Sequence, residues 1–287
     1  MIPGSFDYHR PQSVSEATAM LADLGEDALI VAGGHSLIPM MKLRMALPEH
    51  LIDIQDIADI KSISISGRDV AIGAMVTQAD LINSAELQAI CPILRETSLQ
   101  IADPQIRNLG TIGGNVANGD PGNDLPALMQ TLDASYILVS NSGTREVKAR
   151  DFYEAAYFTE RSETEILTAI HFTAPPAGHG FSYMKQKRKI GDYATAAAAV
   201  IIALKDGTVE SASIGLTNVS DTPLYAEQAS RLLIGSRLDD ATIKSAVEAA
   251  KTITDPAEDG RGPKEFRVHL TGVMVERAIR QAIKTAT

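Results

Sequence analysis

Residues 28–36 read ALIVAGGHS, an apolar run that ends in two glycines followed by a small hydroxyl residue. The apolar run predicts a buried strand, and the pattern of residues 37–45 predicts a helix directly after it. Glycines at such a junction permit positive φ angles and remove the Cβ atoms that would hold a ligand away. Consecutive backbone amides at a strand end and helix start are suited to bind a phosphate. The stretch therefore predicts an α/β unit with an anion site at the end of its strand.

We call residues 32–36 the first glycine segment, and residues 111–115 (TIGGN) form a second glycine segment of the same kind. The second lies within residues 103–124, where glycine, proline and asparagine predict a long, ordered loop that binds a ligand. Either segment alone more often marks a tight turn, but two in one domain favour a phosphorylated ligand. The patterns G-x-G-x-x-G and G-x-x-x-x-G-K-[ST] are both absent, which weakens the nicotinamide and ATP interpretations.

The remaining pattern predicts two α/β regions separated by a linker at residues 174–178 (APPAG). Three strands followed by three helices come after the linker, an order typical of an α+β domain. Before the linker we expect helices at 14–24, 77–84, 92–101 and 124–132, strands at 50–54 and 165–172, and hairpins turning at 66–67 and 141–143. After it we expect strands at 181–188, 194–204 and 208–217 and helices at about 224–235, 239–252 and 264–285.

Composition excludes several classes of partner. The 287 residues carry 26 Lys and Arg against 36 Asp and Glu, a net charge of −10, which disfavours nucleic acid and anionic lipid. Residues 1–10 show no signal-peptide pattern, and the longest apolar run, residues 194–204, is too short to cross a bilayer. We therefore expect a cytoplasmic protein. The basic cluster at residues 185–189 is either a site for a small anion or a solvated strand end.

A single cysteine, Cys91, limits the redox chemistry of the chain itself. An iron–sulfur cluster needs about four cysteines and a structural zinc site usually needs at least two. We expect Cys91 to be a half-buried small apolar residue, and the six histidines show no metal-binding spacing. Any redox chemistry must therefore use a bound organic cofactor.

Taken together, these residues resemble the FAD-binding medium subunits of the molybdenum hydroxylases, the xanthine dehydrogenase family. Those subunits use an A-G-G-H-S segment and a T-I-G-G segment for the flavin, and both occur here, at residues 32–36 and 111–114. The resemblance covers nearly the whole chain. Residues 102–108, 118–124 and 187–193 are most similar to the aerobic carbon monoxide dehydrogenase branch, although sister enzymes acting on aldehydes, purines and nicotine-like rings share much of this scaffold.

The resemblance implies an α+β fold with two domains. Residues 1–175 would form a two-lobed PCMH-type FAD-binding domain, with lobes of about 1–57 and 58–175 and FAD between them. Residues 178–285 would form a smaller domain of the type found at the C-terminus of carbon monoxide dehydrogenase flavoproteins, with a three-stranded antiparallel sheet and three helices.

The resemblance also implies which residues bind the cofactor and that none is catalytic or binds a metal. The backbone of the two glycine segments would hold the pyrophosphate, through Ala32, Gly33, Gly34, His35, Ser36, Thr111, Ile112, Gly113, Gly114 and Asn115. Asp124 would bond ribose hydroxyls, or else only cap a helix, and Leu167 would pack on the flavin. Lys185 would lie near the pyrimidine edge, where a cation stabilises a reduced, anionic flavin. Tyr193 would lie against the isoalloxazine face, or else be only a packed aromatic.

The implied function is an electron relay in a larger oxidoreductase. A large partner subunit would carry the molybdenum cofactor and a small one two iron–sulfur clusters, in a dimer of heterotrimers. For the carbon monoxide branch the final acceptor would be a quinone or a related carrier, which would place the complex in the cytoplasm at the inner face of the membrane. Two alternatives stay open: the flavoprotein subunit of an aldehyde, purine or N-heterocycle dehydrogenase, and a scaffold or binding module without a cofactor.

Overall fold

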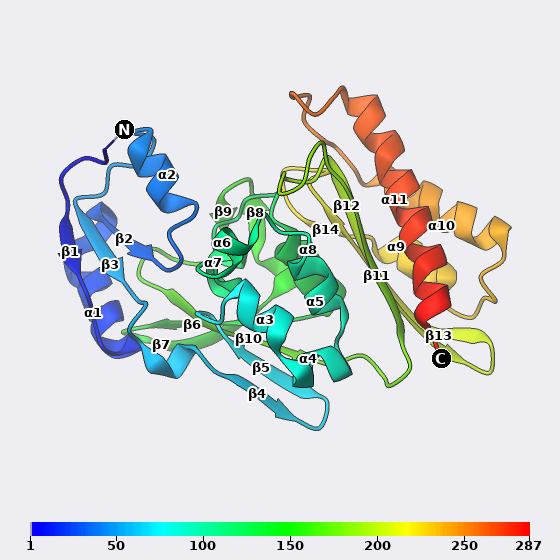
Figure 1. The fold of residues 1–287 in the computed structure, drawn as a ribbon, viewed down its shortest axis with the longest axis horizontal. Coiled ribbons are helices and arrows are strands. Elements are labelled where there is room, and N and C mark those ends of the chain that lie inside the picture. Colours follow the sequence, from blue (N-terminus) through cyan, green and yellow to red (C-terminus); the bar gives the residue numbers. More distant parts are fainter. Residues whose placement is uncertain (1) are drawn as a thin grey trace.

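The computed structural model describes residues 2–287 and begins with a small parallel sheet, which we call the N-terminal lobe (Figure 1). Its strand order is β1-β3-β2, and β3 pairs in parallel with both neighbours. Ser13 caps the first helix by accepting a hydrogen bond from the Glu16 amide. The elements are β1 (Asp7–His9), α1 (Val14–Leu24), β2 (Ala28–Val31), α2 (Leu37–Lys42) and β3 (His50–Asp53), with a 3-10 turn at Gly25–Asp27.

A five-stranded antiparallel sheet of order β4-β5-β10-β6-β7 forms the second lobe. The register of β10 shifts between Leu167 and Ala169, a bulge of the kind often found beside functional sites. The strands are β4 (Ile63–Ser66), β5 (Asp69–Gly73), β6 (Ser135–Ser140), β7 (Gly143–Lys148) and β10 (Ile166–Thr173), with a separate small pair β8 (Tyr153–Ala155) and β9 (Phe158–Thr159).

Six short helices pack with this second sheet. They are α3 (Gln78–Asn83), α4 (Ala85–Ile90), α5 (Ile93–Ser98), α6 (Pro104–Arg107), α7 (Ile112–Ala117) and α8 (Asp124–Thr131), with 3-10 turns at Ala58–Ile60 and Ala149–Asp151. The expectation of an unbroken loop over residues 103–124 was wrong, because α6 and α7 lie within it. Asp103 and Thr111 cap these two helices with their side chains, and α7 buries Ile112 and Val116 in the core.

The C-terminal domain is an antiparallel sheet, β11-β12-β13-β14, covered on its outer face by helices α9, α10 and α11 (Figure 1). The three long strands and three helices were predicted, whereas the two-residue strand β14 was not. The bounds are β11 (Gly180–Gln186), β12 (Ala196–Lys205), β13 (Thr208–Thr217), β14 (Leu224–Tyr225), α9 (Glu227–Leu233), α10 (Asp240–Thr252) and α11 (Lys264–Thr285).

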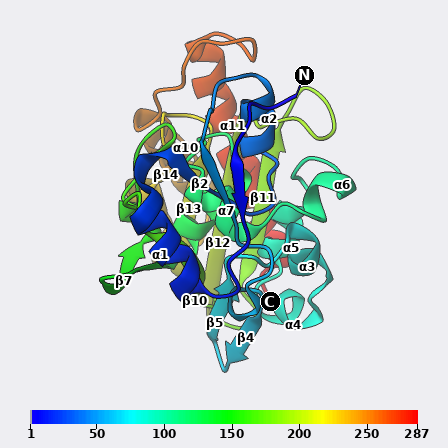
Figure 2. The same ribbon diagram turned by 90° about the vertical axis from the view of Figure 1, so that its left-hand side faces the viewer.

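Strand β12 joins two hydrophobic cores, because its side chains alternate between the two faces of the sheet. Ala197, Ala199 and Ile201 belong to the core of the second lobe, where α5 and α8 pack on the sheet. Ala198 and Val200 belong to the core beneath α9–α11. The C-terminal domain is therefore packed firmly on the second lobe. Figure 2 shows the N-terminal lobe from its outer side, with α1 and β1 in front of the rest of the molecule.

Within the described residues, none of the helices combines the length and the apolar character needed to cross a membrane.

Candidate functional site

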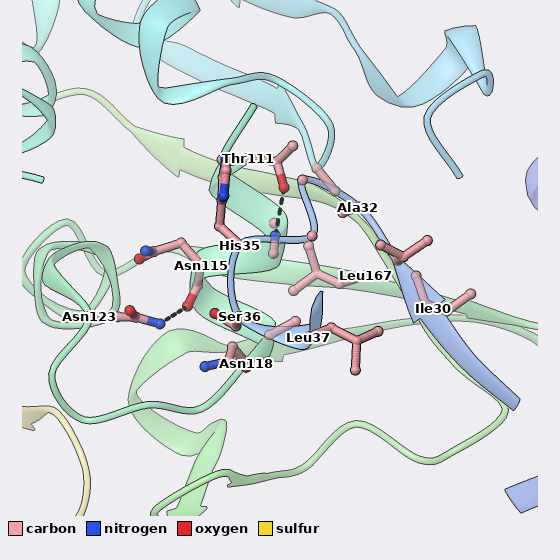
Figure 3. A pocket seen from close by; sticks show the side chains of 18 of the residues that line it. Ile30, Ala32, His35, Ser36, Leu37, Thr111, Asn115, Asn118, Asn123 and Leu167 are labelled. Atoms are coloured by element: carbon pink, nitrogen blue, oxygen red, sulfur yellow. Dashed lines mark hydrogen bonds between the residues drawn. The ribbon is translucent and has the colours of Figure 1, made fainter. Parts of the chain in front are cut away.

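A cavity of about 750 Å³ lies where the N-terminal lobe, the second lobe and the C-terminal domain meet. Its volume is within the ~300–1,000 Å³ that is usual for pockets of small molecules and cofactors. Figure 3 shows the chain that follows β2 lying across the start of α7, with His35, Ser36 and Asn115 gathered around the space between them. The first glycine segment contributes to one wall, and residues 110–118 contribute to the facing one.

The first glycine segment and Leu37 line this cavity and carry a row of free backbone donors. The first hydrogen bond of α2 runs from the Ile38 amide to the Gly34 carbonyl, at 2.9 Å. Among the described residues, nothing accepts a hydrogen bond from the amides of residues 33–37. Gly34 adopts φ +74°, a left-handed conformation that glycine takes without strain. Five consecutive amides are thus available to an anionic ligand, as the sequence of this segment predicts.

The second glycine segment is built differently, and its amides are largely used within the protein. The amides of Ile112 and Gly113 donate to the Val76 and Ala74 carbonyls, each at 2.9 Å. The amide of Gly114 donates to Thr111 Oγ1 at 3.0 Å, and that of Asn115 to the Thr111 carbonyl at 3.0 Å. Of the five amides in this segment, only that of Thr111 has no acceptor among the described residues. The segment therefore does not form a second row of free amides.

Close packing explains two glycines, one in each segment. A Cβ on Gly33 would lie 2.2 Å from the Leu109 carbonyl oxygen, and one on Gly113 would lie 2.5 Å from the Cβ of Ala74. Both distances are far inside van der Waals contact, and the first involves rigid backbone. Gly33 thus lets the first segment lie directly on residues 109–110, just before the second segment, and Gly113 lets α7 lie directly on the turn after β5.

Two buried polar atoms in the cavity wall have no partner among the described residues. They are Nε2 of His35 and Oε1 of Gln78. Leaving a buried polar atom unsatisfied costs about 1–3 kcal/mol, so a ligand with polar groups would remove this penalty. The ring nitrogen of His35 that has no partner thus belongs to a residue that lines the cavity. Gln78 was not predicted as a site residue, because nothing in the sequence around it in α3 indicates that it binds a ligand.

Asp124 and Lys185 form a buried ion pair in the cavity wall. Lys185 Nζ, on β11, lies 2.7 Å from Oδ2 of Asp124, the first residue of α8, and their side chains are 1% and 5% exposed. Burial raises the pKa of Asp124, while the ammonium of Lys185 and the Tyr183 hydroxyl lower it. The N-cap of α8 is Asn123, so capping does not account for Asp124. The resemblance places the two side chains at different parts of the dinucleotide, whereas in this structure they contact each other.

Leu167 and Tyr193 also line the cavity. Leu167 is buried beside the bulge of β10. Tyr193 is 43% exposed, and its ring packs so closely on the turn at residues 120–122 that a Cβ on Gly122 would lie 2.9 Å from it. Burial, together with the nearby carboxylate of Asp120, raises the pKa of Tyr193 to about 12. The phenol is therefore neutral at physiological pH.

The structure thus gathers most of the expected residues around one cavity. Thirteen line it, namely Ala32, Gly33, Gly34, His35, Ser36, Thr111, Gly113, Gly114, Asn115, Asp124, Leu167, Lys185 and Tyr193. Ile112 is the exception, because its side chain is fully buried in the core of the second lobe. Asn118, Asn123 and Glu165 line the cavity without having been predicted individually. The two asparagines flank the turn within residues 118–124, which was predicted only as part of a ligand-binding loop and as a stretch similar to the carbon monoxide dehydrogenase branch.

No group of three or more His, Cys, Asp or Glu side chains that could hold a metal ion occurs among residues 2–287. Cys91 is fully buried rather than half-buried, and burial raises the pKa of its thiol to about 12. Its environment is that of a core residue.

Comparison with known proteins relates both parts of the chain to described domains. Residues 4–175 match the family described as "FAD binding domain in molybdopterin dehydrogenase", and residues 181–282 match the "CO dehydrogenase flavoprotein C-terminal domain". The sequence is 60% identical to the carbon monoxide dehydrogenase medium chain of Afipia carboxidovorans and 46% identical to that of Hydrogenophaga pseudoflava, over 98% of each chain in both cases. A chain in the structure of reconstituted CO dehydrogenase from Oligotropha carboxidovorans is similar over 100% of both chains, with a TM-score of 0.98 and 59% identity.

Proposed function

The chain belongs to the FAD-binding chains of the molybdopterin dehydrogenases, and on that premise we propose that it carries FAD in the 750 Å³ cavity as the electron-relay subunit of a carbon monoxide dehydrogenase. The family, the α+β fold and the FAD cofactor predicted from the sequence are confirmed by the domain matches and by the relatives.

The row of free amides at residues 33–37 is the observation that carries the assignment of this cavity to FAD. A diphosphate has several anionic oxygens, and each hydrogen bond to a charged group is worth roughly 1.5–3 kcal/mol. His35, whose buried Nε2 has no partner among the described residues, lies in the same segment. We infer that the first glycine segment holds the pyrophosphate and that the second one mainly shapes the facing wall.

We assign the flavin ring to the part of the cavity that contains Leu167, Lys185 and Tyr193. Leu167 offers an apolar surface, Tyr193 an aromatic one, and Lys185 a buried cation paired with Asp124. Bound FAD supplies one- and two-electron transfer, and the protein contributes position and electrostatics. In this assignment Asp124 acts beside Lys185 near the flavin rather than at a distant ribose.

Substrate chemistry belongs to other chains in this proposal, because the described residues offer no metal site. We infer a molybdenum-containing large subunit and an iron–sulfur small subunit as partners, in a dimer of heterotrimers. A quinone or related respiratory carrier is the proposed acceptor, with the complex at the inner face of the cytoplasmic membrane. The medium-chain relatives, at 60% and 46% identity over almost their whole length, support this choice of complex.

Purification of the chain together with its partners tests the proposal. We expect a flavin absorption spectrum, about one FAD per chain, and electron transfer to a quinone when CO is the substrate. Activity with an aldehyde, a purine or an N-heterocycle instead of CO would favour the alternative dehydrogenases. A complex without flavin would favour the scaffold alternative.

A further inference from the structure

Tyr183 lies directly behind the cavity wall and does not itself line the cavity. Its side chain is 1% exposed. It is two residues before Lys185 on β11, so both side chains point to the same face of the sheet. That face packs toward α5 and α8, where Asp124 begins the second of these helices.

The two carboxylate oxygens of Asp124 accept hydrogen bonds from Tyr183 and Lys185, one oxygen from each. Oδ1 accepts a hydrogen bond from the Tyr183 hydroxyl at 2.5 Å, and Oδ2 accepts one from Lys185 Nζ at 2.7 Å. The Tyr183 hydroxyl also lies 3.3 Å from Thr217 Oγ1 on β13. Lys185 Nζ donates in addition to the Gln100 carbonyl at 3.2 Å. The network therefore runs from the interior of the C-terminal domain to the wall of the cavity.

We propose that Tyr183 is a positioning residue which, through Asp124, keeps the charge of Lys185 only partly neutralised at the cavity wall and thereby raises the reduction potential of the flavin. This inference rests on the proposed binding of FAD in the cavity.

The physical reason is the distribution of charge on Asp124. A short hydrogen bond from a phenol draws negative charge toward Oδ1, and in a buried site such charge-assisted bonds are strong. Without the phenol, the full negative charge of the carboxylate faces the ammonium and cancels more of its field. Reduction adds negative charge to the flavin, so a less neutralised cation favours the reduced form.

The protonation state of Tyr183 suits this role. Burial and the neighbouring carboxylate of Asp124 both raise the pKa of Tyr183 well above its usual value. The phenol therefore remains a hydrogen-bond donor throughout the neutral pH range. Its hydrogen bond in turn lowers the pKa of Asp124, against the larger opposing effect of burial.

The chain contains a matched control for the loss of a buried phenol. Tyr136 is also fully buried and hydrogen-bonded, to the Tyr153 hydroxyl at 2.9 Å, but neither of these tyrosines lines the cavity. Tyr136→Phe should therefore reproduce any general effect of removing a buried hydroxyl without acting on Lys185.

The test is the flavin reduction potential of the FAD-loaded complex, measured by equilibration with redox dyes. For Tyr183→Phe we expect the affinity for reduced relative to oxidised FAD to fall about tenfold, which for a two-electron couple converts to a potential lower by about 30 mV. Tyr136→Phe should leave the potential unchanged. In a Lys185→Met/Asp124→Asn background, adding Tyr183→Phe should produce no further shift, because the groups through which it acts are gone.

An unchanged potential in Tyr183→Phe would overturn the inference, and so would a shift that persists in the Lys185→Met/Asp124→Asn background. If Tyr183→Phe cannot be obtained with flavin, Thr217→Val replaces it, since it removes the other hydroxyl of the network. A lower potential in Thr217→Val would support the inference, and an unshifted one would overturn it. A wild-type complex that binds no FAD would instead contradict the proposed function itself.

Discussion

Lys185 Nζ lies 2.7 Å from Asp124 Oδ2, and both side chains are almost completely excluded from solvent. The pair joins the C-terminal domain to the first residue of α8 across the wall of the proposed FAD cavity. It therefore contributes both to the stability of the fold and to the electrostatics of the site.

The stability of the folded protein should depend strongly on both partners of this ion pair. Lys185→Met leaves the Asp124 carboxylate buried without its cation, so we expect the free energy of unfolding to fall by about 3–5 kcal/mol. The double variant Lys185→Met/Asp124→Asn should recover most of this loss, because no uncompensated charge remains. Urea unfolding of the flavin-free chain measures both values. Additive losses in the double variant would show that the two residues do not act as a pair.

The two partners should shift the flavin reduction potential in opposite directions. Removing the cation with Lys185→Met should lower the potential, whereas removing the anion with Asp124→Asn should raise it, since reduction adds negative charge to the flavin. FAD should remain bound in both variants, because the pyrophosphate is held elsewhere. Shifts of the same sign in the two variants, or no shift in either, would contradict the placement of the pair beside the flavin.

Much of this site was predictable because its most informative segment is local. An apolar strand, two glycines and a helix follow one another within residues 28–42, and the structure places free amides there. The use of the amides in the second glycine segment depends on Ala74 and Val76, which lie in another part of the chain. The motifs therefore predicted two rows of free amides, and the described residues show one such row.

Contacts between distant residues, very short strands and helices in a glycine-rich stretch are the features that could not be predicted from the sequence. Asp124 and Lys185 are 61 residues apart, so no local pattern pairs them. Strands β1 and β14 have three and two residues, too few for a recognisable alternation of side chains. Helices α6 and α7 were not predicted, because the glycines and prolines of residues 103–124 indicated a loop. Asp103 and Thr111 are nevertheless both typical helix caps.

The pair of Glu165 and Arg145 predicts a dependence of stability on pH. Hydrogen bonds from the guanidinium of Arg145, at 2.6 and 2.8 Å, hold the pKa of Glu165 below its usual value. The resulting stabilisation is present above the usual carboxyl pKa of about 4.3 and is lost as the pH falls through the lower, folded-state value. It should amount to about 1–2 kcal/mol at pH 7, since Arg145 is 40% exposed and solvent screens the pair.

Urea unfolding of wild type and Glu165→Gln at pH 7 and at about pH 3 measures this contribution. The difference between the two proteins should be largest at pH 7 and should shrink as the pH falls. Glu163→Gln is the matched control, because the side chain of Glu163 is exposed. A difference that grows on acidification would contradict the assigned cause.

The thiol of Cys91 should be chemically silent in the folded protein. It is fully buried, and burial raises its pKa to about 12, so almost no thiolate exists at neutral pH. We expect Ellman's reagent to label no thiol in native buffer and one per chain in denaturing urea. Rapid labelling of the native protein would contradict the burial of this residue.

Gly33 offers the most specific change where the first glycine segment packs on residues 109–110, just before the second segment. A Cβ at this position would meet the Leu109 carbonyl oxygen at 2.2 Å, so Gly33→Ala should push the first segment away from Leu109 and disturb the row of amides. Gly34 is less suitable, because its φ of +74° makes any side chain strained. Gly260→Ala is the matched control, since a Cβ there meets no atom within 4 Å.

The FAD content of the purified complex, determined for wild type, Gly33→Ala and Gly260→Ala, tests the central claim most directly. The account predicts about one FAD per chain in wild type and Gly260→Ala, and little or none in a folded Gly33→Ala variant. A wild-type complex without flavin, or a folded Gly33→Ala variant with its full complement of FAD, would contradict the placement of FAD between these two segments.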